Sequence, residues 1–290
     1  MPSCLNRGRF SIRLDLRESF LRLDLQRLKY VSSTANPQIK RAVGLYDRKT
    51  CEQEGVFLVD GERLFCDGLE SAQRFESVFL LEKHLDAYQD GLAYLAHGGA
   101  DIFIVSDAVM AKLSATKNPQ GIFAIAIREP REIPLDSTLL LILDGVSDPG
   151  NAGTLLRAAE AAGAEGVIFT PSSVDPYHEK VVRSAMGAHF RLPIWRNLTV
   201  AEFKKHFSDH SLFLADLSGE TSYAEVDWQQ KSTLIVGGEA NGAGAEAKLL
   251  AKPIYIDMHG KTESLNAGIA GAVILFEAAR QRRFSGALKT

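Results

Sequence analysis

The sequence predicts an α/β protein in which a small α/β unit precedes a larger unit with a mainly parallel sheet. Short apolar runs alternate with segments of helical pattern along most of the 290 residues, as in proteins of that class. Three of the runs end abruptly in glycine and polar residues, which is typical of buried parallel strands whose carboxyl ends open into a ligand crevice. Residues 129–137, a charged segment with two prolines, are predicted to be a linker between the two units.

The first unit is predicted to span residues 31–128. Pro37 follows a Ser/Thr/Asn cluster and stands where the first turn of a helix tolerates proline. Three residues of this helix are expected on one face: Ile39, Val43 and Tyr46. Four apolar runs are predicted to be strands, with helices between them: 56–61, 77–82, 101–106 and 121–127.

The second unit is predicted to span residues 138–290. Its apolar runs predict strands at 139–144, 166–170, 192–196, 212–217, 233–238 and 253–258. An Ala-rich helix at 151–164 follows the first strand, and further helices are predicted at 179–189 and 201–207. The chain closes with a long helix at 264–283 whose middle is apolar nearly all round. Such a helix packs against more than its own sheet, which suggests a subunit interface.

The formal net charge of −3 conceals an uneven distribution. Residues 1–50 carry an excess of seven positive charges, and the remainder carries an excess of ten negative charges. This basic front suggests that the N-terminal end meets a polyanion, and it is equally compatible with a solvated helix face. Residues 1–30 alternate Arg with Leu, Ile and Phe, a pattern that does not distinguish a helix, a strand pair or a disordered extension.

Composition and cysteine usage indicate the cellular compartment in which the protein is expected. With 46% hydrophobic residues the chain can bury a sizeable core, but no apolar run approaches the length that spans a bilayer. The three cysteines, Cys4, Cys51 and Cys66, form no CxxC pair, and acidic residues near the N-terminus argue against a secretory or transit signal. We therefore expect a reduced, cytoplasmic setting and no membrane role.

Polar residues after two of the strands are candidate ligand contacts. The run at 139–144 is followed by a glycine-rich turn, DPGNAG, and such a turn before a helix presents backbone amides to an anion or polar ligand. Arg157 lies further along the predicted helix, although the pattern alone also fits an ordinary turn followed by a surface arginine. The turn GGEANG at 237–242 places Glu239 among glycines, where an ionised carboxylate needs partners.

A dinucleotide-binding site is a rival interpretation of the same region. Residues 242–247 nominally match the G-x-G-x-x-G/A fingerprint, and Asp257 could serve as the acid that binds a ribose. The first glycine falls several residues beyond the strand, and the acid comes earlier than the usual spacing. Metal binding is disfavoured as well, because the i, i+4 pair His206 and His210 has no third ligand candidate beside it.

The three strand ends carry three short sequence signatures in order along the chain. The first, N-x-G-x-x-x-R-x-A, is present as Asn151, Gly153, Arg157 and Ala159. The second, G-x-E-x-x-G, is present as Gly237, Glu239 and Gly242. The third, I-x-M followed by S-L-N, is present as Ile256, Met258, Ser264, Leu265 and Asn266. Taken together, they resemble the signature set of the SpoU (TrmH) family of RNA ribose 2′-O-methyltransferases, within the knotted SPOUT superfamily.

The first unit resembles the RNA-substrate-binding domain that often accompanies this catalytic domain. The resemblance is carried by SSTANPQIKRAVGL at 32–45, GVFLVDGERL at 55–64 and TKNPQGIFAI at 116–125. That domain has a small α/β fold of the ribosomal-protein type and grips structured RNA. The resemblance implies RNA contacts by four basic residues: Lys40, Arg41, Arg48 and Lys49.

The family resemblance also implies a trefoil-knotted catalytic domain, S-adenosylmethionine as methyl donor, and no metal. It implies a homodimer that acts on structured RNA, with ribosomal RNA as the expected substrate. Backbone groups of three residues are the expected cofactor contacts, namely Gly237, Ile256 and Leu265, with Gly238, Gly242 and Met258 beside them. Arg157 is expected to orient the ribose hydroxyl and stabilise developing negative charge, because a guanidinium stays protonated and is a poor base. Four residues would complete the polar shell: Asn151, Glu239, Ser264 and Asn266.

Two positions depart from the family pattern. Asp257 replaces the usual proline of the third signature, and Ala267-Gly268 replaces a common Val-Ser. We therefore expect a different pocket backbone, and Asp257 to change the affinity for a cationic cofactor in either direction. Three alternative functions remain open: a transfer RNA ribose methyltransferase, a non-catalytic RNA-binding or ribosome-assembly protein on the same fold, and an NAD-dependent oxidoreductase.

Overall fold

The structure is a computed structural model that describes residues 23–24 and 28–284. It divides into two compact units, and the boundary falls between Glu129 and Pro130. Most of the predicted extension over residues 1–30 lies outside the described residues. No helix in the described part of the chain is long and apolar enough to cross a bilayer.

The first unit contains a mixed five-stranded sheet. Its strands lie in the order β1 (Lys29–Val31), β4 (Asp101–Val105), β3 (Phe75–Leu81), β5 (Ile122–Ile127) and β2 (Val56–Asp60). β5 runs antiparallel to both of its neighbours, and the other pairs are parallel. The four predicted strands are present, whereas β1 is a three-residue edge strand that the sequence pattern did not indicate.

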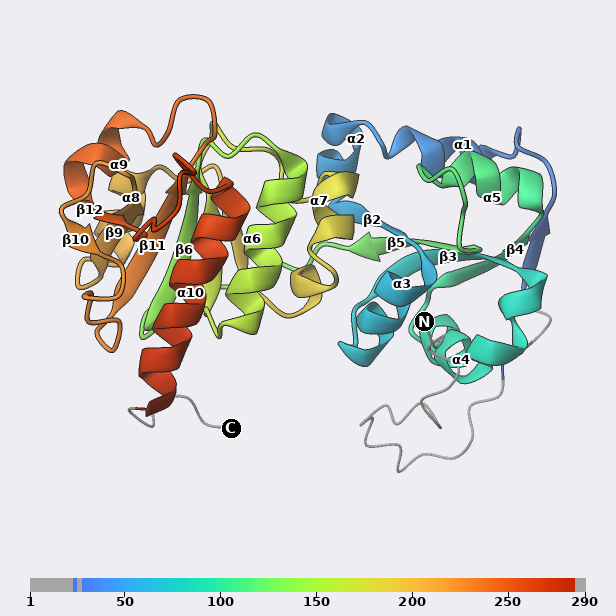
Figure 1. Ribbon diagram of the computed structural model, residues 1–290. Helices are drawn as coiled ribbons and strands as arrows, with labels where there is room; N and C mark the ends of the chain where they lie inside the picture. The colour runs from blue at the N-terminus through green and yellow to red at the C-terminus, as the bar shows by residue number, and fades with distance from the viewer. Residues whose placement is uncertain (1–22, 25–27, 285–290) are drawn as a thin grey trace. The chain divides into compact units, whose positions relative to one another are not determined.

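Helices cover both faces of this sheet (Figure 1). One face carries α1 (Pro37–Gly44), α2 (Arg48–Gln53) and α5 (Asp107–Leu113), and the other carries α3 (Glu62–Glu70) and α4 (Gln89–His97). Asn36 caps α1 by accepting a hydrogen bond from the Gln38 N–H at 2.9 Å. α1 ends before Tyr46, so the prediction that Tyr46 shares a helical face with Ile39 is wrong. The Tyr46 hydroxyl instead donates to the Leu113 carbonyl at 2.8 Å.

The second unit contains a seven-stranded sheet in which every neighbouring pair is parallel. The order is β10 (Thr221–Ser222), β12 (Lys252–Tyr255), β9 (Ser211–Ala215), β11 (Ser232–Gly237), β6 (Leu139–Asp144), β7 (Gly166–Phe169) and β8 (Ile194–Arg196). The predicted α/β class with a mainly parallel sheet is therefore confirmed. β10, with two residues, had no sequence signal of its own.

Apolar residues on both faces of the central strands explain why their sequences read as unbroken hydrophobic runs. Leu139, Leu141 and Leu143 pack with the core under α6 (Pro149–Ala161), α7 (Glu179–Ser184) and α10 (Ala267–Phe284). Leu140 and Ile142 pack on the opposite side, with α8 (Val200–His206) and α9 (Ala245–Leu250). Figure 1 shows the two helical layers on either side of the sheet. Side chains of a strand alternate between its faces, so covering both faces requires apolar residues throughout.

Two helices of the second unit are shorter than predicted. α7 ends at Ser184, because Met186 and Gly187 have positive φ angles of 49° and 87° that a helix cannot accommodate. α10 begins at Ala267 rather than at Ser264. Single 3₁₀ turns lie at Glu82–His84, Asp86–Tyr88 and Ala188–Phe190.

Candidate active site

The carboxyl ends of β9, β11 and β12 form a pocket in the second unit, beside the first turns of α10. Parallel strands end at one edge of their sheet, so segments far apart in the sequence meet there. The pocket has a volume of about 470 Å³, within the range of small-molecule sites. Predicted residues of the second and third signatures line it: Gly237, Gly238, Glu239, Gly242, Ile256, Met258, Ser264, Leu265 and Asn266.

The turn after β11 needs glycine because other backbone atoms approach it closely. A Cβ atom on Gly238 would lie 2.1 Å from the Gly145 carbonyl oxygen, and one on Gly237 would lie 2.4 Å from a backbone nitrogen. The Gly238 N–H donates to the Asp144 carbonyl at 3.1 Å, and Gly238 and Gly242 exchange two backbone hydrogen bonds. One wall of the pocket is therefore bare backbone, which suits a ligand read by amides and carbonyls.

Two carboxylates that were not among the predicted site residues belong to this region. Asp144 ends β6 and is buried, and its Oδ2 accepts a hydrogen bond from the Gly244 N–H at 2.7 Å, which fixes the far end of the glycine turn. Asp216 lines the pocket just after β9, and its Oδ1 accepts bonds from the N–H and the hydroxyl of Ser218, both at 2.8 Å. Both directly follow an apolar run, and that pattern was the available signal. Neither residue belongs to one of the three signatures.

The first and second signatures meet through an amide–carboxylate pair. Asn151 Nδ2 donates a hydrogen bond to Glu239 Oε1. Asn151 is placed by the first turn of α6, where the Asp148 carboxylate caps the helix and accepts from the Asn151 N–H at 2.8 Å. Glu239 lines the pocket, and Asn151 supports it without lining the pocket itself. The pair supplies the partner that a carboxylate among glycines requires.

The third signature joins the same cluster at the start of α10. Asn266 Oδ1 accepts a hydrogen bond from the Ile269 N–H at 3.2 Å, which ties it to the first turn of the helix. A Cβ atom on Gly268 would lie 3.2 Å from the Oδ1 atoms of both Asn151 and Asn266. Side chains of all three signatures therefore converge around Gly268 and Glu239.

Arg157 does not take part in this convergence. It is exposed on α6, one turn after Gly153, and it does not line the pocket. Gly153 packs against α7, because a Cβ atom there would lie 1.8 Å from Ser184 Oγ and 2.8 Å from the Val181 carbonyl oxygen. Residues four apart share a side of a helix, so Arg157 lies toward α7 whereas Asn151 lies toward α10.

Comparisons with known proteins show which family shares this arrangement of signatures. Residues 138–276 match the family model described as the SpoU rRNA Methylase family, and residues 36–124 match the MRM3-like substrate binding domain. An uncharacterized tRNA/rRNA methyltransferase of Synechocystis sp. is 31% identical over an alignment of 261 residues that covers 87% of this chain and 94% of that protein. The chain belongs to the SpoU rRNA methylase family.

Other SpoU family members extend the comparison. The 23S rRNA (guanosine(2553)-2′-O)-methyltransferase RlmP of Bacillus subtilis is 28% identical over 253 residues, 86% of this chain and 98% of that protein. Among solved structures, the AdoMet-bound rRNA methyltransferase from Sinorhizobium meliloti has a TM-score of 0.79 and 28% identity, covering 89% of this chain and 98% of its own. The family resemblance drawn from the three signatures is thus confirmed.

The two departures from the SpoU pattern have local structural explanations. The Asp257 carboxylate accepts a hydrogen bond from Ser222 Oγ at 2.5 Å, and Asp257 does not line the pocket although Ile256 and Met258 do. Asp257 therefore does not contact a ligand of this pocket directly, and it is placed to act through the backbone of its two neighbours. Gly268, in place of the common serine, leaves room for the two asparagine side chains that converge on it.

The predicted RNA contacts of this SpoU protein lie on α1 and α2 of the first unit. Lys40, Arg48 and Lys49 are exposed. Arg41 instead forms ion pairs with Glu54 and Glu76, and the hydrogen bond that it donates to Glu76 raises the pKa of the Arg41 guanidinium above its usual value. Its charge is compensated within its own unit, so Lys40 and Lys49 are better placed to meet a phosphate. RNA contact by these residues stays a prediction.

The His206–His210 pair is not arranged as a metal site. His210 is buried, with Nε2 2.9 Å from the Ser137 carbonyl oxygen and Nδ1 2.9 Å from Thr233 Oγ1. Nε2 must donate to the carbonyl, so Nδ1 accepts from the hydroxyl, and both ring nitrogens are occupied. Within the described residues no group of three His, Cys, Asp or Glu side chains could hold a metal ion.

Proposed function

We propose that this protein transfers a methyl group from S-adenosylmethionine to a ribose 2′-hydroxyl of ribosomal RNA. The observation that carries the proposal is the convergence of three family signatures around one pocket at the carboxyl ends of parallel strands. A relative of nearly equal extent is named for 23S rRNA 2′-O-methylation, and a structural relative is named as AdoMet-bound. The first unit matches a substrate-binding domain, which supports RNA as the substrate.

The pocket fits the cofactor in size and in charge. Glycine backbone at Gly237 and Gly238 and apolar side chains of Ile256 and Leu265 provide surfaces for an adenosine. The charged residues that line the pocket are the carboxylates Asp216 and Glu239, with no lysine or arginine among its described lining. A negative lining favours a cationic ligand over a neutral one. S-adenosylmethionine supplies a methyl group on a positively charged sulfur, which makes that carbon electrophilic.

The chain's own residues then have to place and activate the ribose hydroxyl. Glu239, held by Asn151, presents a fixed polar group at the pocket, and Asn266 holds the adjacent helix start. Arg157 supplies a permanent positive charge that orients the hydroxyl and a neighbouring phosphate and stabilises the negative charge that develops on oxygen. A guanidinium does not accept a proton at ordinary pH, so Arg157 acts by charge and hydrogen bonding rather than as a base. The new bond joins the ribose oxygen to the methyl carbon, the carbon–sulfur bond breaks to leave a neutral thioether, and the hydroxyl proton passes to water.

Labelled methyl transfer tests this function directly. Purified protein, labelled S-adenosylmethionine and separated ribosomal or transfer RNA are combined, and the label is followed into the ribose. Label in ribosomal RNA is expected; label in transfer RNA alone would move the substrate assignment to that alternative. Binding of S-adenosylmethionine without transfer to either RNA would favour the non-catalytic assembly role. Calorimetric binding of NAD in place of S-adenosylmethionine would overturn the proposal.

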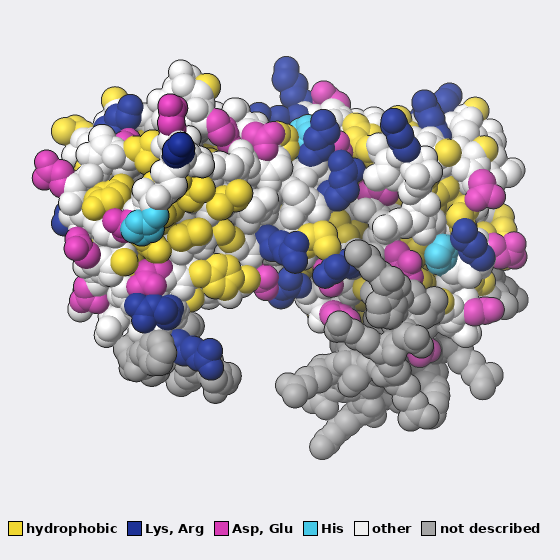
Figure 2. Space-filling model, in the orientation of Figure 1, with side chains coloured by type: hydrophobic (Ala, Val, Ile, Leu, Met, Phe, Trp, Pro, Cys, Tyr) yellow, Lys and Arg dark blue, Asp and Glu magenta, His cyan; other side chains and the backbone are white. Residues whose placement is uncertain are grey.

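We propose that the second unit pairs with a second copy through α10. Ile269 and Phe276 are each 52% exposed, and residues seven apart lie on one face of a helix. Figure 2 shows hydrophobic side chains gathered over this part of the unit. Ala270 and Ile274 of the same helix line the pocket, so the interface would adjoin the cofactor site.

Replacing Phe276 with Glu is expected to weaken dimerisation about 1000-fold, because loss of a central aromatic contact costs roughly 2 kcal/mol and the change occurs in both copies. Sedimentation of the purified protein over a concentration series measures the dimer dissociation constant. Leu249→Glu, which alters an 84% exposed leucine on α9, is the matched control and is expected to sediment as wild type. A wild-type protein that is monomeric at all concentrations contradicts the assignment.

The trefoil knot implied by the resemblance is likewise proposed for the second unit. β12 lies between β9 and β10 in the sheet although it follows both in the sequence. Gly219, after β9, packs directly on the β12 backbone, because a Cβ atom there would lie 2.9 Å from Ile254 main-chain atoms. An experimental chain trace in which residues 254–266 do not pass through the preceding loop would refute the knot.

A further inference from the structure

Asp257 lies in the chain segment that forms one wall of the pocket, between two residues that line it. It lies two residues beyond the end of β12, between Ile256 and Met258, which both line the pocket. In an extended chain, successive side chains point to opposite sides, so the Asp257 side chain points away from the pocket while the side chains of Ile256 and Met258 point toward it. Its Oδ2 accepts a hydrogen bond from Ser222 Oγ at 2.5 Å.

Ser222 is a well-placed partner because it is itself held by the sheet. It is 7% exposed and lies in β10, where it pairs with Tyr255 of β12. The next residue, Tyr223, donates its N–H to the Tyr255 carbonyl at 2.8 Å. The Ser222–Asp257 bond extends these contacts past the end of β12, into the segment that lines the pocket.

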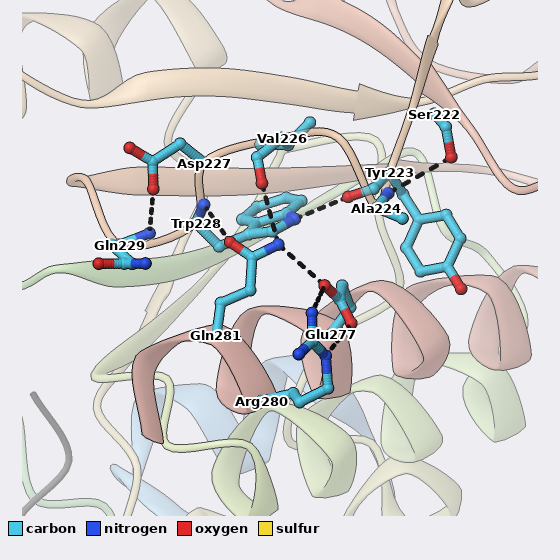
Figure 3. A network of polar contacts seen from close by, with 10 residues as sticks. All are labelled: Ser222, Tyr223, Ala224, Val226, Asp227, Trp228, Gln229, Glu277, Arg280 and Gln281. Atoms are coloured by element: carbon cyan, nitrogen blue, oxygen red, sulfur yellow. Dashed lines mark hydrogen bonds and ion pairs between the residues drawn. The ribbon is translucent and has the colours of Figure 1, made fainter. Parts of the chain in front are cut away.

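The segment that follows Ser222 is anchored on α10. Trp228 is fully buried, and its indole N–H donates to the Tyr223 carbonyl at 2.9 Å. The centroid of its ring lies 5.1 Å from the ring centroid of Phe213 on β9. Gln281 of α10 accepts from the Trp228 N–H and donates to the Val226 carbonyl, both at 3.0 Å. Figure 3 shows these bonds joining the segment to the helix.

A second layer of contacts holds Gln281 in place. Its Nε2 also donates to Glu277 Oε1 at 2.8 Å, and Glu277 is paired with Arg280 (Figure 3). The opposite end of α10 lines the pocket through Ala267, Ala270 and Ile274. The segment 222–228, which we call the brace, therefore connects the end of β12 to the helix that forms another wall of the same pocket.

We propose that Asp257 is a positioning residue, which fixes the cofactor-binding backbone at 256–258 by bonding to Ser222 of the brace. The proposal rests on the proposed function, because it assigns S-adenosylmethionine to this pocket. A proline, expected here from the family pattern, restrains the backbone by fixing its own φ angle and needs no partner. Asp257 achieves the same restraint with a charge-assisted hydrogen bond to the brace. Holding the backbone at 256–258 in its binding conformation raises the affinity for the cofactor, because less conformational entropy is lost when the cofactor binds.

A double-mutant cycle in the full-length protein tests this pairing. Asp257→Ala and Ser222→Ala are each expected to raise the Kd for S-adenosylmethionine about 10-fold, the lower end of what a hydrogen bond to a charged group contributes. The double variant is expected to equal either single variant, because both remove one shared interaction. Asp257→Pro and Ser222→Thr are expected to retain affinity within about 3-fold, since each keeps a restraint. Calorimetry measures the dissociation constants of wild type and of the five variants.

Kinetics separates positioning from catalysis and from general stability. KM for S-adenosylmethionine should rise in the Asp257→Ala variant while kcat at saturating cofactor stays near wild type. Asp209→Ala, which removes an exposed carboxylate paired with Lys231, is the matched control and should change neither constant. Independent, multiplying effects of the two alanine variants would overturn the proposal, as would wild-type affinity in both. Failure of Asp257→Pro to bind, with its melting temperature unchanged, would overturn it too. A wild-type protein that does not bind S-adenosylmethionine would instead refute the proposed function.

Discussion

Arg157→Ala is expected to reduce methyl transfer about 100- to 1000-fold, the loss typical of removing one donor that stabilises developing oxyanion charge. The cofactor Kd should stay within about 2-fold of wild type, because Arg157 is exposed on α6 and does not line the pocket. Single-turnover transfer to RNA, with calorimetry of S-adenosylmethionine binding, measures the two effects separately.

Two further variants sharpen this result. Arg157→Lys keeps the charge but loses the planar fork, so an intermediate rate is expected. Arg191→Ala is the control. It removes an exposed arginine whose ion-pair partner, Glu160, lies on α6 like Arg157, and the variant should transfer methyl groups at the wild-type rate. Wild-type transfer by Arg157→Ala would show that the role assigned to this residue is wrong.

Gly238→Ala is expected to weaken S-adenosylmethionine binding about 100-fold or more, with a loss of stability of about 1–3 kcal/mol from overpacking. The added Cβ atom would lie 2.1 Å from the Gly145 carbonyl oxygen, and a backbone atom cannot swing aside as a side chain can. The turn must therefore move, which breaks its bond to the Asp144 carbonyl and deforms the pocket wall.

Gly260→Ala is the matched control for this effect, because within the described part of the chain no atom beyond its own residue and its two chain neighbours lies within 4 Å of the added Cβ. It should bind S-adenosylmethionine as wild type does. Calorimetry gives both dissociation constants, and thermal unfolding shows whether Gly238→Ala is still folded at the assay temperature. A Gly238→Ala protein with wild-type affinity would mean that this turn does not form the cofactor pocket.

Much of the fold follows from the sequence because the central strands are buried on both faces. The runs at 139–143 and 234–236 are apolar at every position for that reason, and this made the strands recognisable. The short edge strands β1 and β10 had no such signal, since three and two residues are fixed by their neighbours rather than by their own pattern. α7 ends early because Met186 and Gly187 take positive φ angles, which a helical pattern does not reveal.

The candidate site was predictable where a motif specifies backbone, and less so where it depends on strand order. Gly237, Gly238 and Gly242 mark a turn that only bare backbone can make, so their motif points to the pocket. Asp144 and Asp216 enter the region because β6 and β9 flank β11, and strand order is not contained in any local pattern.

The spacing of Arg157 from Asn151 already indicates that the two side chains do not point the same way, although both belong to one signature. Six residues separate it from Asn151, and at 3.6 residues per turn the two side chains leave α6 in different directions. Asn151 Oδ1 accordingly lies beside Gly268 of α10, whereas Gly153, one turn before Arg157, packs against α7. Members of one signature therefore have different surroundings: Asn151 supports a pocket residue, and Arg157 is exposed outside the pocket lining.

Mapping of ribose methylation on ribosomal RNA from a deletion strain tests the central claim most directly. We expect one 2′-O-methylated nucleotide of ribosomal RNA to disappear in the deletion strain, and to return with the wild-type gene but not with Arg157→Ala. Unchanged ribosomal RNA methylation in the deletion strain, or restoration by Arg157→Ala to the wild-type level, would contradict the account.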